Sequence, residues 1–589
     1  MASEYLAPTI LSARRLFGPN VFDRSAGAVL EVECITADAH AAVEYWPTAV
    51  HALAHALAWP SPRCMQWTSA TSAQLFLTAP RDGLLTASDL SEFAWVAAER
   101  HVQGVTHDLA PVIKELQRRA AAEATRWHGV IEASAWAERH DLNVSMDDDG
   151  YAIGSGVGAC VVTTSPLHPG KPPAAAALRE AFDVPIVVVT GSNGKTTTTR
   201  LIAAMARADG YATGWCCSDG VWVDDQQIER GDFTGPSGAR RVLSDRRVEF
   251  AVLETARGGM LRRGLALTHS RTAVITNISA DHFGEYGVSS LADLTTVKST
   301  VARTLHDDAT LVLNADDIEL ARLGTRVPAA VAYFSAQPVS QDGDASDVLS
   351  HNARFAAREQ QGTVQLWFGG VWHEVGPINA MPITLGGRAR HNVANVLAAS
   401  LAACASGVSL GAIRNTLAQF GAQLSDNPGR LMQRSIGDVT VIMDYAHNPD
   451  GITSLCRTAA SMPAARRLLL IGQAGDRDDA HLRALATAAW NTVAFDRVII
   501  KEMTAMLRGR AVGEIPRVLT TAFVEAGADA HAVTVAPSEL AGVREAFIWA
   551  RPGDLLVLGV HVTRDAVLAF VQTLLDSAWR SGMPVPDIV

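Results

Sequence analysis

A glycine-rich turn followed by lysine and threonine carries the clearest chemistry in this sequence. Ile186–Arg200 reads IVVVTGSNGKTTTTR, so a β-branched apolar run enters the turn and a helical stretch follows from near Thr196. Gly191 and Gly194 let backbone N–H groups approach phosphate oxygens, and the start of the helix adds its partial positive charge. Lys195 has the reach to contact the outer phosphates of a nucleotide, and the Thr196 hydroxyl is suited to bind Mg²⁺.

The spacing of this loop is tighter than in the general phosphate-binding motif. In the pattern G-x-x-x-x-G-K-[ST] the first glycine would fall at position 189, where this chain has Val189. The form present is G-x-N-G-K-T-T, which adds Asn193 and Thr197 to the residues predicted to contact a nucleotide. The alternative is a glycine-rich turn with a chance lysine, which the preceding strand and the Lys-Thr pair together disfavour.

A second apolar run ends in a carboxylate that could bind a metal ion. Val252–Gly259 reads VLETARGG, an apolar run that predicts a strand ending at Glu254. Ligands of open α/β sheets bind beyond the carboxyl ends of the strands, and a carboxylate is a preferred ligand of Mg²⁺. Glu254 is therefore predicted to hold Mg²⁺ opposite the phosphate loop, with an acidic helix cap as the alternative.

The Gly-Asn-Gly-Lys-Thr-Thr form of the loop resembles the Mur ligase family, ATP-dependent enzymes that join an amine to a carboxylate. The resemblance runs from about residue 180 to 589 and rests on several motifs in the order found in the family. It implies that Glu254 binds magnesium. Ile275–Gly287, ITNISADHFGEYG, matches the family pattern T-N-x-x-x-D-H, which implies that Asn277 lies beside the nucleotide and His282 binds a second metal ion.

Further roles follow from the same resemblance. Lys298 stands where many Mur ligases carry a carbamylated lysine that helps to bind the second Mg²⁺; an ordinary surface lysine is the alternative. Asn314, in VLNADD, matches the segment that meets the adenine, and its amide can both donate and accept. Arg430 would neutralise ATP phosphates, and Asp444 would accept from the ribose hydroxyls.

Two residues are predicted to face the substrates rather than ATP. His447 belongs to the VIMDYAHNP segment, whose His and Asn would face the cleft between domains in a Mur ligase. Arg257 lies beside Gly258 and Gly259 and could bind a substrate carboxylate through two hydrogen bonds. A structural salt bridge is an equally good interpretation of Arg257.

The elements that must position these residues form three blocks. Residues 1–170 mix β-like runs with long helical stretches and predict an α+β N-terminal domain for substrate recognition or assembly. Residues 180–378 alternate continuous apolar β-branched runs with helical patterns, which predicts a parallel sheet covered on both faces. Residues 379–589 predict a second α/β domain, Rossmann-like, after the ATP-binding core.

Within the family, the likeness is greatest to the ligase half of cyanophycin synthetases. The segments ETARGGMLRRG, SDG, GDFTGP and LRGRAVGE all resemble that branch. Cyanophycin synthetases also carry an ATP-grasp domain before the ligase part, and the first 170 residues of this chain are too few to hold it beside an N-terminal domain. We therefore expect a single ligation rather than the synthesis of an Asp–Arg polymer.

Composition excludes several other classes of protein. The chain has 589 residues, 48% of them hydrophobic, with Lys+Arg 50 against Asp+Glu 61 and a formal net charge of −11. The negative charge argues against broad binding to nucleic acid or to anionic membranes. Seven scattered cysteines without a C-x-x-C pair support neither a disulfide scaffold nor a zinc module. With no signal-like start and no long apolar run, the sequence predicts a cytoplasmic protein.

The resemblance and the residues together predict an ADP-forming ligase. The carboxylate would attack the γ-phosphate of ATP, and an amine, by resemblance an amino acid or small peptide, would then attack the acyl phosphate. Relatives of this type often assemble as dimers or tetramers, so a homo-oligomer is expected. The alternatives are a P-loop NTPase or kinase, and a regulatory nucleotide-binding protein derived from a Mur ligase. The presence of Lys195, Glu254 and His282 argues against the regulatory protein.

Overall fold

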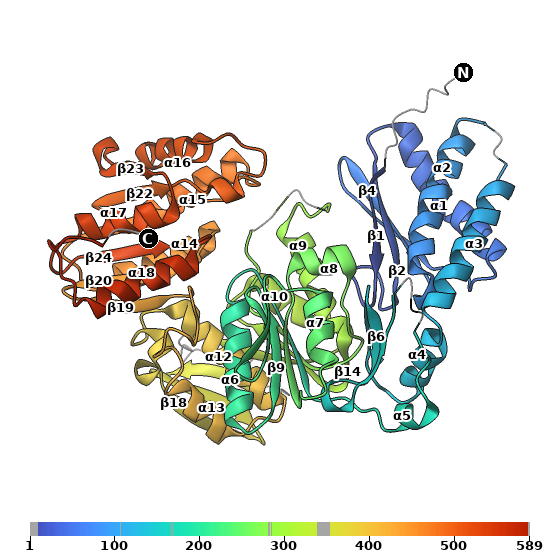
Figure 1. The fold of residues 1–589 in the computed structure, drawn as a ribbon, viewed down its shortest axis with the longest axis horizontal. Coiled ribbons are helices and arrows are strands. Elements are labelled where there is room, and N and C mark those ends of the chain that lie inside the picture. The colour runs from blue at the N-terminus through green and yellow to red at the C-terminus, as the bar shows by residue number, and fades with distance from the viewer. Residues whose placement is uncertain are drawn as a thin grey trace.

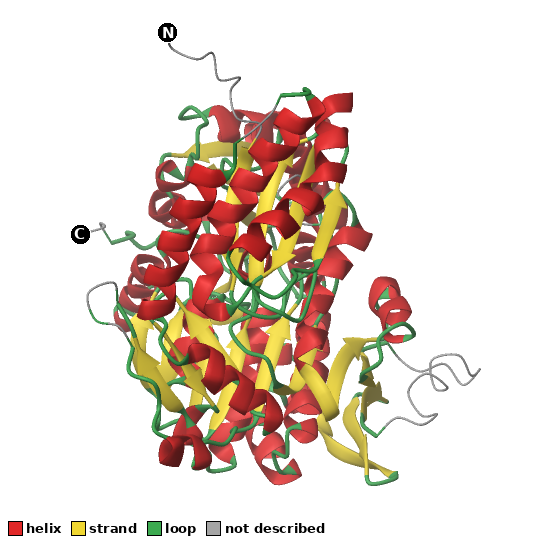
Figure 2. Cartoon of the chain, turned by 90° about the vertical axis from the view of Figure 1, so that its right-hand side faces the viewer, coloured by secondary structure: helices red, strands yellow, loops and turns green. Residues whose placement is uncertain are grey.

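The computed structural model describes residues 10–105, 108–165, 168, 170–280, 283, 286–337 and 354–586. Four β-sheets organise this part of the chain, two N-terminal, one central and one C-terminal (Figure 1). Figure 2 shows helices packed around the strands throughout the body of the molecule. Within the described residues no helix is both long enough and apolar enough to span a membrane.

The N-terminal region holds two small antiparallel sheets. The larger has the order β1-β2-β4-β3, with bounds Ile10–Leu16, Gly27–Glu33, Ser72–Thr78 and Cys64–Thr68. The smaller joins β5 (Val144–Asp147), β6 (Gly150–Ile153) and β7 (Cys160–Thr163). The helices are α1 (Ala37–Ala56), α2 (Leu84–Val102), α3 (Ala110–Arg126), α4 (Val130–Arg139) and α5 (Ala175–Arg179). This α+β architecture is the predicted one.

The central sheet is mostly parallel, as the continuous apolar runs predict. Its order is β11-β10-β9-β12-β8-β13-β14-β15-β16-β17-β18, and the pairs from β9 to β16 are parallel. Antiparallel hairpins, β10–β11 and β17–β18, form its two edges. The strand bounds are β8 Ile186–Thr190, β9 Thr213–Cys217, β10 Gly220–Val223, β11 Gln226–Arg230, β12 Phe250–Glu254, β13 Ser270–Ile275, β14 Leu305–Asn314, β15 Ala330–Ser335, β16 Ala356–Gln360, β17 Thr363–Phe368 and β18 Val371–Pro377.

Burial on both faces explains why β8 reads as an uninterrupted apolar run. Val187 and Val189 belong to one core cluster, and Ile186 and Val188 belong to the cluster on the opposite face. All four side chains are at most 1% exposed, so neither face tolerates a polar residue. The helices of this region are α6 (Lys195–Ala208), α7 (Pro236–Leu243), α8 (Arg257–Arg263), α9 (Leu291–Lys298), α10 (Ile318–Gly324), α12 (Arg390–Ala405) and α13 (Leu410–Leu417).

The packing of α12 bears on where the third domain begins. Val393, Val396 and Leu397 share a core cluster with Val187 of β8, so α12 covers the central sheet. The sequence places this helix in the block that starts at residue 379. We propose that the boundary lies nearer residue 420, after α13, which belongs to the same core cluster.

The C-terminal sheet is a second α/β unit with the order β19-β20-β24-β21-β22-β23. Only β19 is antiparallel to its neighbour in this sheet. The strands are β19 Met432–Ile436, β20 Val439–Asp444, β21 Arg467–Ile471, β22 Arg497–Lys501, β23 Val533–Ala536 and β24 Leu555–Gly559. The helices are α14 Pro449–Ala460, α15 Asp479–Thr492, α16 Glu514–Glu525, α17 Glu539–Trp549 and α18 Arg564–Asp576. The prediction that this domain belongs to the α/β class is confirmed.

Candidate functional site

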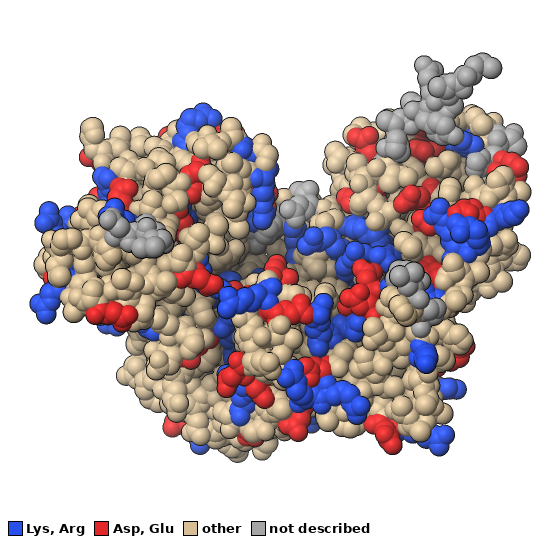
Figure 3. All heavy atoms as spheres, viewed as in Figure 1, with Lys and Arg blue, Asp and Glu red and all other residues tan. Residues whose placement is uncertain are grey.

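A cavity of about 380 Å³ lies between the carboxyl ends of the central strands and the start of the C-terminal unit. Figure 3 shows a notch between the N-terminal and C-terminal parts of the chain, with Lys and Arg side chains gathered on the central part that forms its floor. Most of the predicted site residues line the cavity. They are Asn193, Gly194, Lys195, Thr196, Thr197, Glu254, Asn277, Asn314, Arg430, Asp444 and His447.

The phosphate loop is held in shape by its own backbone and by Asn277. The Asn277 side chain accepts from the Asn193 N–H at 2.9 Å and donates to the Asn193 carbonyl at 3.0 Å. Gly191 and Gly194 have φ angles of +146° and +83°, a region that favours glycine. Asn277 therefore binds the backbone of the loop itself. The sequence predicted only that this residue lies beside the nucleotide.

Gly191→Ala is expected to weaken ATP binding at least tenfold and to lower the free energy of unfolding by about 1–3 kcal/mol. A Cβ at this position would overlap the Thr276 hydroxyl, and the positive φ adds backbone strain. Calorimetric titration with ATP and thermal melts measure both effects. Gly411→Ala is the matched control, because a Cβ there meets only the Ser409 hydroxyl, at 3.9 Å. Unchanged ATP affinity in Gly191→Ala would contradict the role of this loop.

Two lysines hold the carbonyl side of the loop. The Lys195 ammonium donates to the carbonyls of Gly191 at 3.0 Å and Ser192 at 2.9 Å. Lys298, only 4% exposed, donates to the Gly191 carbonyl at 2.7 Å. Lys298 is therefore not the ordinary surface lysine that the sequence left open, although its carbamylation stays a prediction.

Glu254 is the buried acid of the site. Its side chain is 2% exposed at the end of β12, and Oε2 has no hydrogen-bond partner among the described residues. Burial raises the pKa of Glu254, and the nearby charges of Lys195 and Arg430 offset this only in part. A carboxylate oxygen left without a partner near the Thr196 hydroxyl fits a hard cation, so Glu254 and Thr196 suit the predicted Mg²⁺.

The C-terminal unit supplies the other wall of the cavity. Arg430 donates to the Ser218 hydroxyl at 3.2 Å and lies over the Tyr445 ring at 4.4 Å. The Asp444 oxygens accept one backbone N–H each, from Leu431 and Ala446, both at 2.7 Å. A carboxylate has about four acceptor positions, so Asp444 keeps capacity for the predicted ribose hydroxyls.

Hydrogen bonds tie the phosphate loop directly to the C-terminal unit. Asn193 donates to the Asp450 carboxylate at 3.0 Å and accepts from the Asn448 amide at 3.0 Å. The Asn427 amide donates to the Thr197 hydroxyl at 3.1 Å. The two sides of the cavity thus meet at the loop.

Not every predicted site residue lies in this cavity. Of the described residues, Gly191, Lys298 and Arg257 are outside its lining, although Gly191 and Lys298 contact each other beside it. Arg257 is 7% exposed at the start of α8, and its predicted contact with a substrate carboxylate stays a proposal. His282 lies outside the described residues.

Sequence reasoning missed several residues that line the cavity. Ser218 belongs to the SDG segment, which was recognised without a role for this side chain, and His391 and Asn395 belong to the motif RHNVAN at residues 390–395. Burial lowers the pKa of His391, against the opposing effect of Asp444 and Asp450, which favours the neutral imidazole. The signal available in the sequence was the motif itself, since two of its polar residues, His391 and Asn395, share one helix turn.

Two family models match this chain, and both describe domains of the same family. The model of the Mur ligase middle domain matches residues 189–403, and that of the Mur ligase glutamate ligase domain matches residues 429–559. A cyanophycin synthetase of Trichormus variabilis is 37% identical over 350 residues, which cover 59% of this chain and 38% of that protein. The match thus spans well under half the length of that relative.

Two further matches are more distant. The UDP-N-acetylmuramoyl-L-alanyl-D-glutamate–2,6-diaminopimelate ligase of Geobacillus thermodenitrificans is 27% identical over 389 residues, covering 63% of this chain and 73% of that protein. The solved Mycobacterium tuberculosis folylpolyglutamate synthase, complexed with ADP, is 21% identical. It covers 66% of this chain and 90% of that chain, with a TM-score of 0.48.

Proposed function

The chain belongs to the Mur ligase family across residues 189–559, and on this premise we propose that it is an ATP-dependent ligase that joins a carboxylate to an amine and releases ADP and phosphate. The cavity that gathers Lys195, Glu254 and Arg430 carries the proposal. An amino acid or small peptide is the proposed amine, in line with the name of the related diaminopimelate ligase.

The cationic residues of the cavity can offset the electrostatic repulsion between the two negatively charged substrates. A carboxylate and a triphosphate repel each other, so the site must place cations near both. Lys195 and Arg430 approach the cavity from opposite walls and would stabilise charge that develops on the phosphates. Mg²⁺, when bound by Thr196 and Glu254, would supply a Lewis acid for the phosphoryl oxygens.

The proposed reaction has two bond exchanges. A substrate carboxylate oxygen attacks the γ-phosphorus, the bond to the β-phosphate oxygen breaks, and ADP leaves. The amine nitrogen then attacks the acyl carbon, phosphate leaves with its bonding electrons, and the nitrogen releases a proton. Because water would hydrolyse the acyl phosphate, the contacts of Asn193 with Asn448 and Asp450 matter as a seal between the two walls.

The test combines product analysis with a matched pair of variants. The protein is incubated with Mg·ATP and pools of amino acids, small peptides and polyamines, and ADP, AMP and new masses are quantified. We expect ADP and a condensed mass that has lost one water, both absent in Lys195→Ala. Lys171→Ala, at an exposed lysine, is the control and should keep full turnover.

The other outcomes separate the alternatives. AMP in place of ADP would contradict an acyl phosphate. ADP without a condensed product in any pool would favour a P-loop NTPase, and ATP binding without turnover would favour a regulatory protein.

A further inference from the structure

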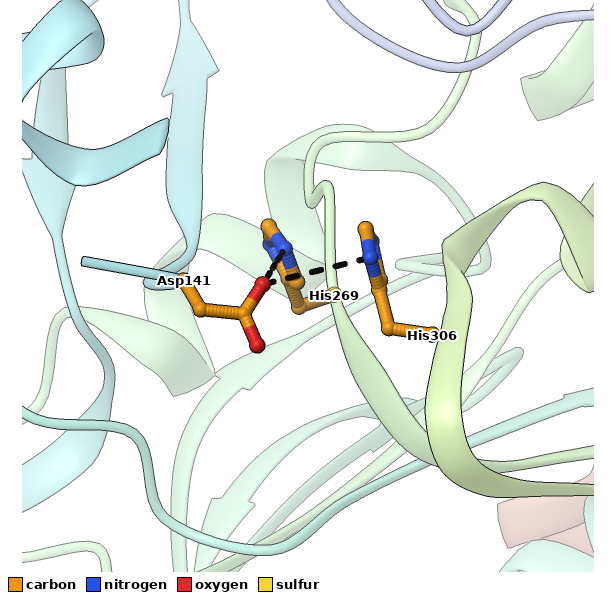
Figure 4. A group of neighbouring side chains, drawn as sticks. All are labelled: Asp141, His269 and His306. Carbon is orange, nitrogen blue, oxygen red and sulfur yellow. Dashed lines mark ion pairs between the residues drawn. The ribbon is translucent and has the colours of Figure 1, made fainter. Parts of the chain in front are cut away.

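Three side chains from separate parts of the chain converge at one point (Figure 4), on the side of the central sheet away from the phosphate loop. Asp141 follows α4 of the N-terminal region, His269 directly precedes β13, and His306 is the second residue of β14. The cavity described above lies at the carboxyl ends of these strands, whereas this cluster lies at their amino ends. The nitrogen and oxygen atoms that could bind a metal ion all lie within 4.8 Å of one another.

Both imidazoles direct a ring nitrogen at the same carboxylate oxygen. His269 Nε2 lies 3.2 Å from Asp141 Oδ1, and His306 Nδ1 lies 4.0 Å from the same atom. The side chains of the two histidines are 17% and 33% exposed, and that of Asp141 is 79% exposed. A small ion can therefore reach the cluster from solvent.

The hydrogen bond of His306 fixes which of its nitrogens carries the proton. Its Nε2 lies 3.2 Å from the Thr268 carbonyl, which can only accept, so Nε2 bears the hydrogen. In the neutral ring Nδ1 then presents a lone pair to Asp141 Oδ1. A lone pair facing a carboxylate oxygen is an arrangement that a cation between them stabilises, and neutral imidazole is the form that binds metals.

A buried amide holds the segment that carries His269. The Asn143 side chain, 1% exposed, accepts from the N–H groups of Thr268 at 3.0 Å and His269 at 2.8 Å. Its amide donates to the His269 carbonyl at 2.8 Å. Asn143 stands two residues after Asp141, so it ties the chain segment that carries Asp141 to the segment that carries His269. The hydrogen bond of His306 Nε2 to the Thr268 carbonyl is an outer contact of the kind typical of histidines that bind metals.

We propose that Asp141, His269 and His306 bind a divalent transition-metal ion of the zinc type, which links the N-terminal region to the central region. Two imidazoles and one carboxylate form a ligand set common for Zn²⁺, and water from the adjoining cavity of about 480 Å³ would be the fourth ligand. Arg24, Arg81 and Arg303 line this cavity and oppose a cation, whereas Glu138 favours one.

Binding requires a local movement of one ring. The two imidazoles are stacked, with centroids 3.7 Å apart and planes 19° apart, whereas a shared ion must lie close to both ring planes. His306, the more exposed of the two, can turn out of the stack toward Asp141. The Asn143 contacts keep the His269 segment in place during this turn, whereas the hydrogen bond of His306 Nε2 to the Thr268 carbonyl must adjust to it.

The test measures zinc binding by the full-length protein without nucleotide. Protein treated with a chelator is titrated with ZnCl₂ by calorimetry and melted with and without ZnCl₂. We expect the wild type to bind one zinc ion more than His269→Gln or His306→Gln, and zinc to raise the Tm of the wild type but not of these two variants. His531→Gln, at an exposed histidine of the C-terminal unit, is the matched control and should behave as the wild type.

Equal zinc stoichiometry and equal thermal shifts in the wild type and both histidine variants would overturn the proposal. If those variants do not fold, Asp141→Asn decides in the same way, because its side chain is mostly exposed. Co²⁺ substitution tests the ligand set. Absorption from nitrogen and oxygen ligands supports the site, whereas an intense thiolate charge-transfer band would assign the metal to the free cysteines instead.

Discussion

Glu254→Gln is expected to stabilise the nucleotide-free protein while reducing turnover by about 10²–10³-fold. The carboxylate is 2% exposed and its Oε2 has no hydrogen-bond partner among the described residues. Leaving such a group buried costs about 1–3 kcal/mol, and glutamine of nearly the same shape carries no charge to desolvate. The same substitution removes the proposed anionic ligand for Mg²⁺, so stability and activity should move in opposite directions.

The pH dependence follows from the raised pKa of Glu254, whose cause is burial. The folded protein keeps this group protonated to higher pH than the unfolded chain does. Its contribution to the free energy of unfolding is therefore complete below the ordinary pKa of 4.5 and is lost as the pH rises through the folded value. The Tm of Glu254→Gln should accordingly exceed that of the wild type by more at neutral pH than at acid pH.

Thermal melts across this range, with and without Mg·ATP, measure the effect. Mg·ATP should raise the Tm of the wild type far more than that of the variant, because the ionised carboxylate then has a cation beside it. Glu180→Gln, at an exposed glutamate, is the control and should match the wild type throughout. A lower Tm for Glu254→Gln without nucleotide at neutral pH would show that the carboxylate is a structural partner instead.

The parts of the site that sequence alone predicts are those built within one short segment. The phosphate loop joins a buried strand, two glycines with positive φ and a helix start, and each of these has a local physical cause. The same holds for Glu254, which the end of an apolar strand places at the ligand-binding edge of the sheet. In these segments the strand and helix periods fix the direction of the side chains.

Contacts between distant segments could not be predicted in this way. Asn193 was expected to contact a nucleotide, yet its side chain reaches Asn448 and Asp450, more than 250 positions away. Asp141 and His306 belong to different regions and have no characteristic spacing, so nothing in the sequence connects them. Such neighbours depend on how the sheets pack, which the local periodicity of the chain does not determine.

Lys501→Met is expected to lower the free energy of unfolding by about 3–5 kcal/mol, the largest stability effect that we predict. Lys501 and Glu539 form a buried ion pair with side chains 0% and 2% exposed. The Lys501 ammonium also donates to the Gly559 carbonyl at 2.6 Å. Methionine has a similar length but leaves the Glu539 charge without its cation. Lys171→Met, at an exposed lysine, should have almost no effect.

The acid limb of the stability curve distinguishes loss of the charge pair from loss of packing. Burial alone raises the pKa of Glu539, but Lys501 and the backbone N–H groups of His561 and Thr563 outweigh it and hold that pKa well below 4.5. This depressed pKa gives the wild type stability that is present above 4.5 and is lost as the pH falls toward the folded value. In Lys501→Met the carboxyl protonates more readily, so the gap in Tm should narrow as the pH falls from 7 to about 4.

A difference in Tm between the wild type and Lys501→Met that stays constant over this pH range would mean that packing, and not charge, causes the loss of stability.

The pair of Lys501 and Glu539 also bears on the candidate site. Glu539 accepts from the backbone of residues 561–563, and His561 Nε2 lies 3.1 Å from the Ala446 carbonyl. Ala446 lines the nucleotide cavity next to His447. Lys501→Met should therefore weaken ATP binding as well, by calorimetric titration below its Tm, although Lys501 itself is not among the residues that line the cavity.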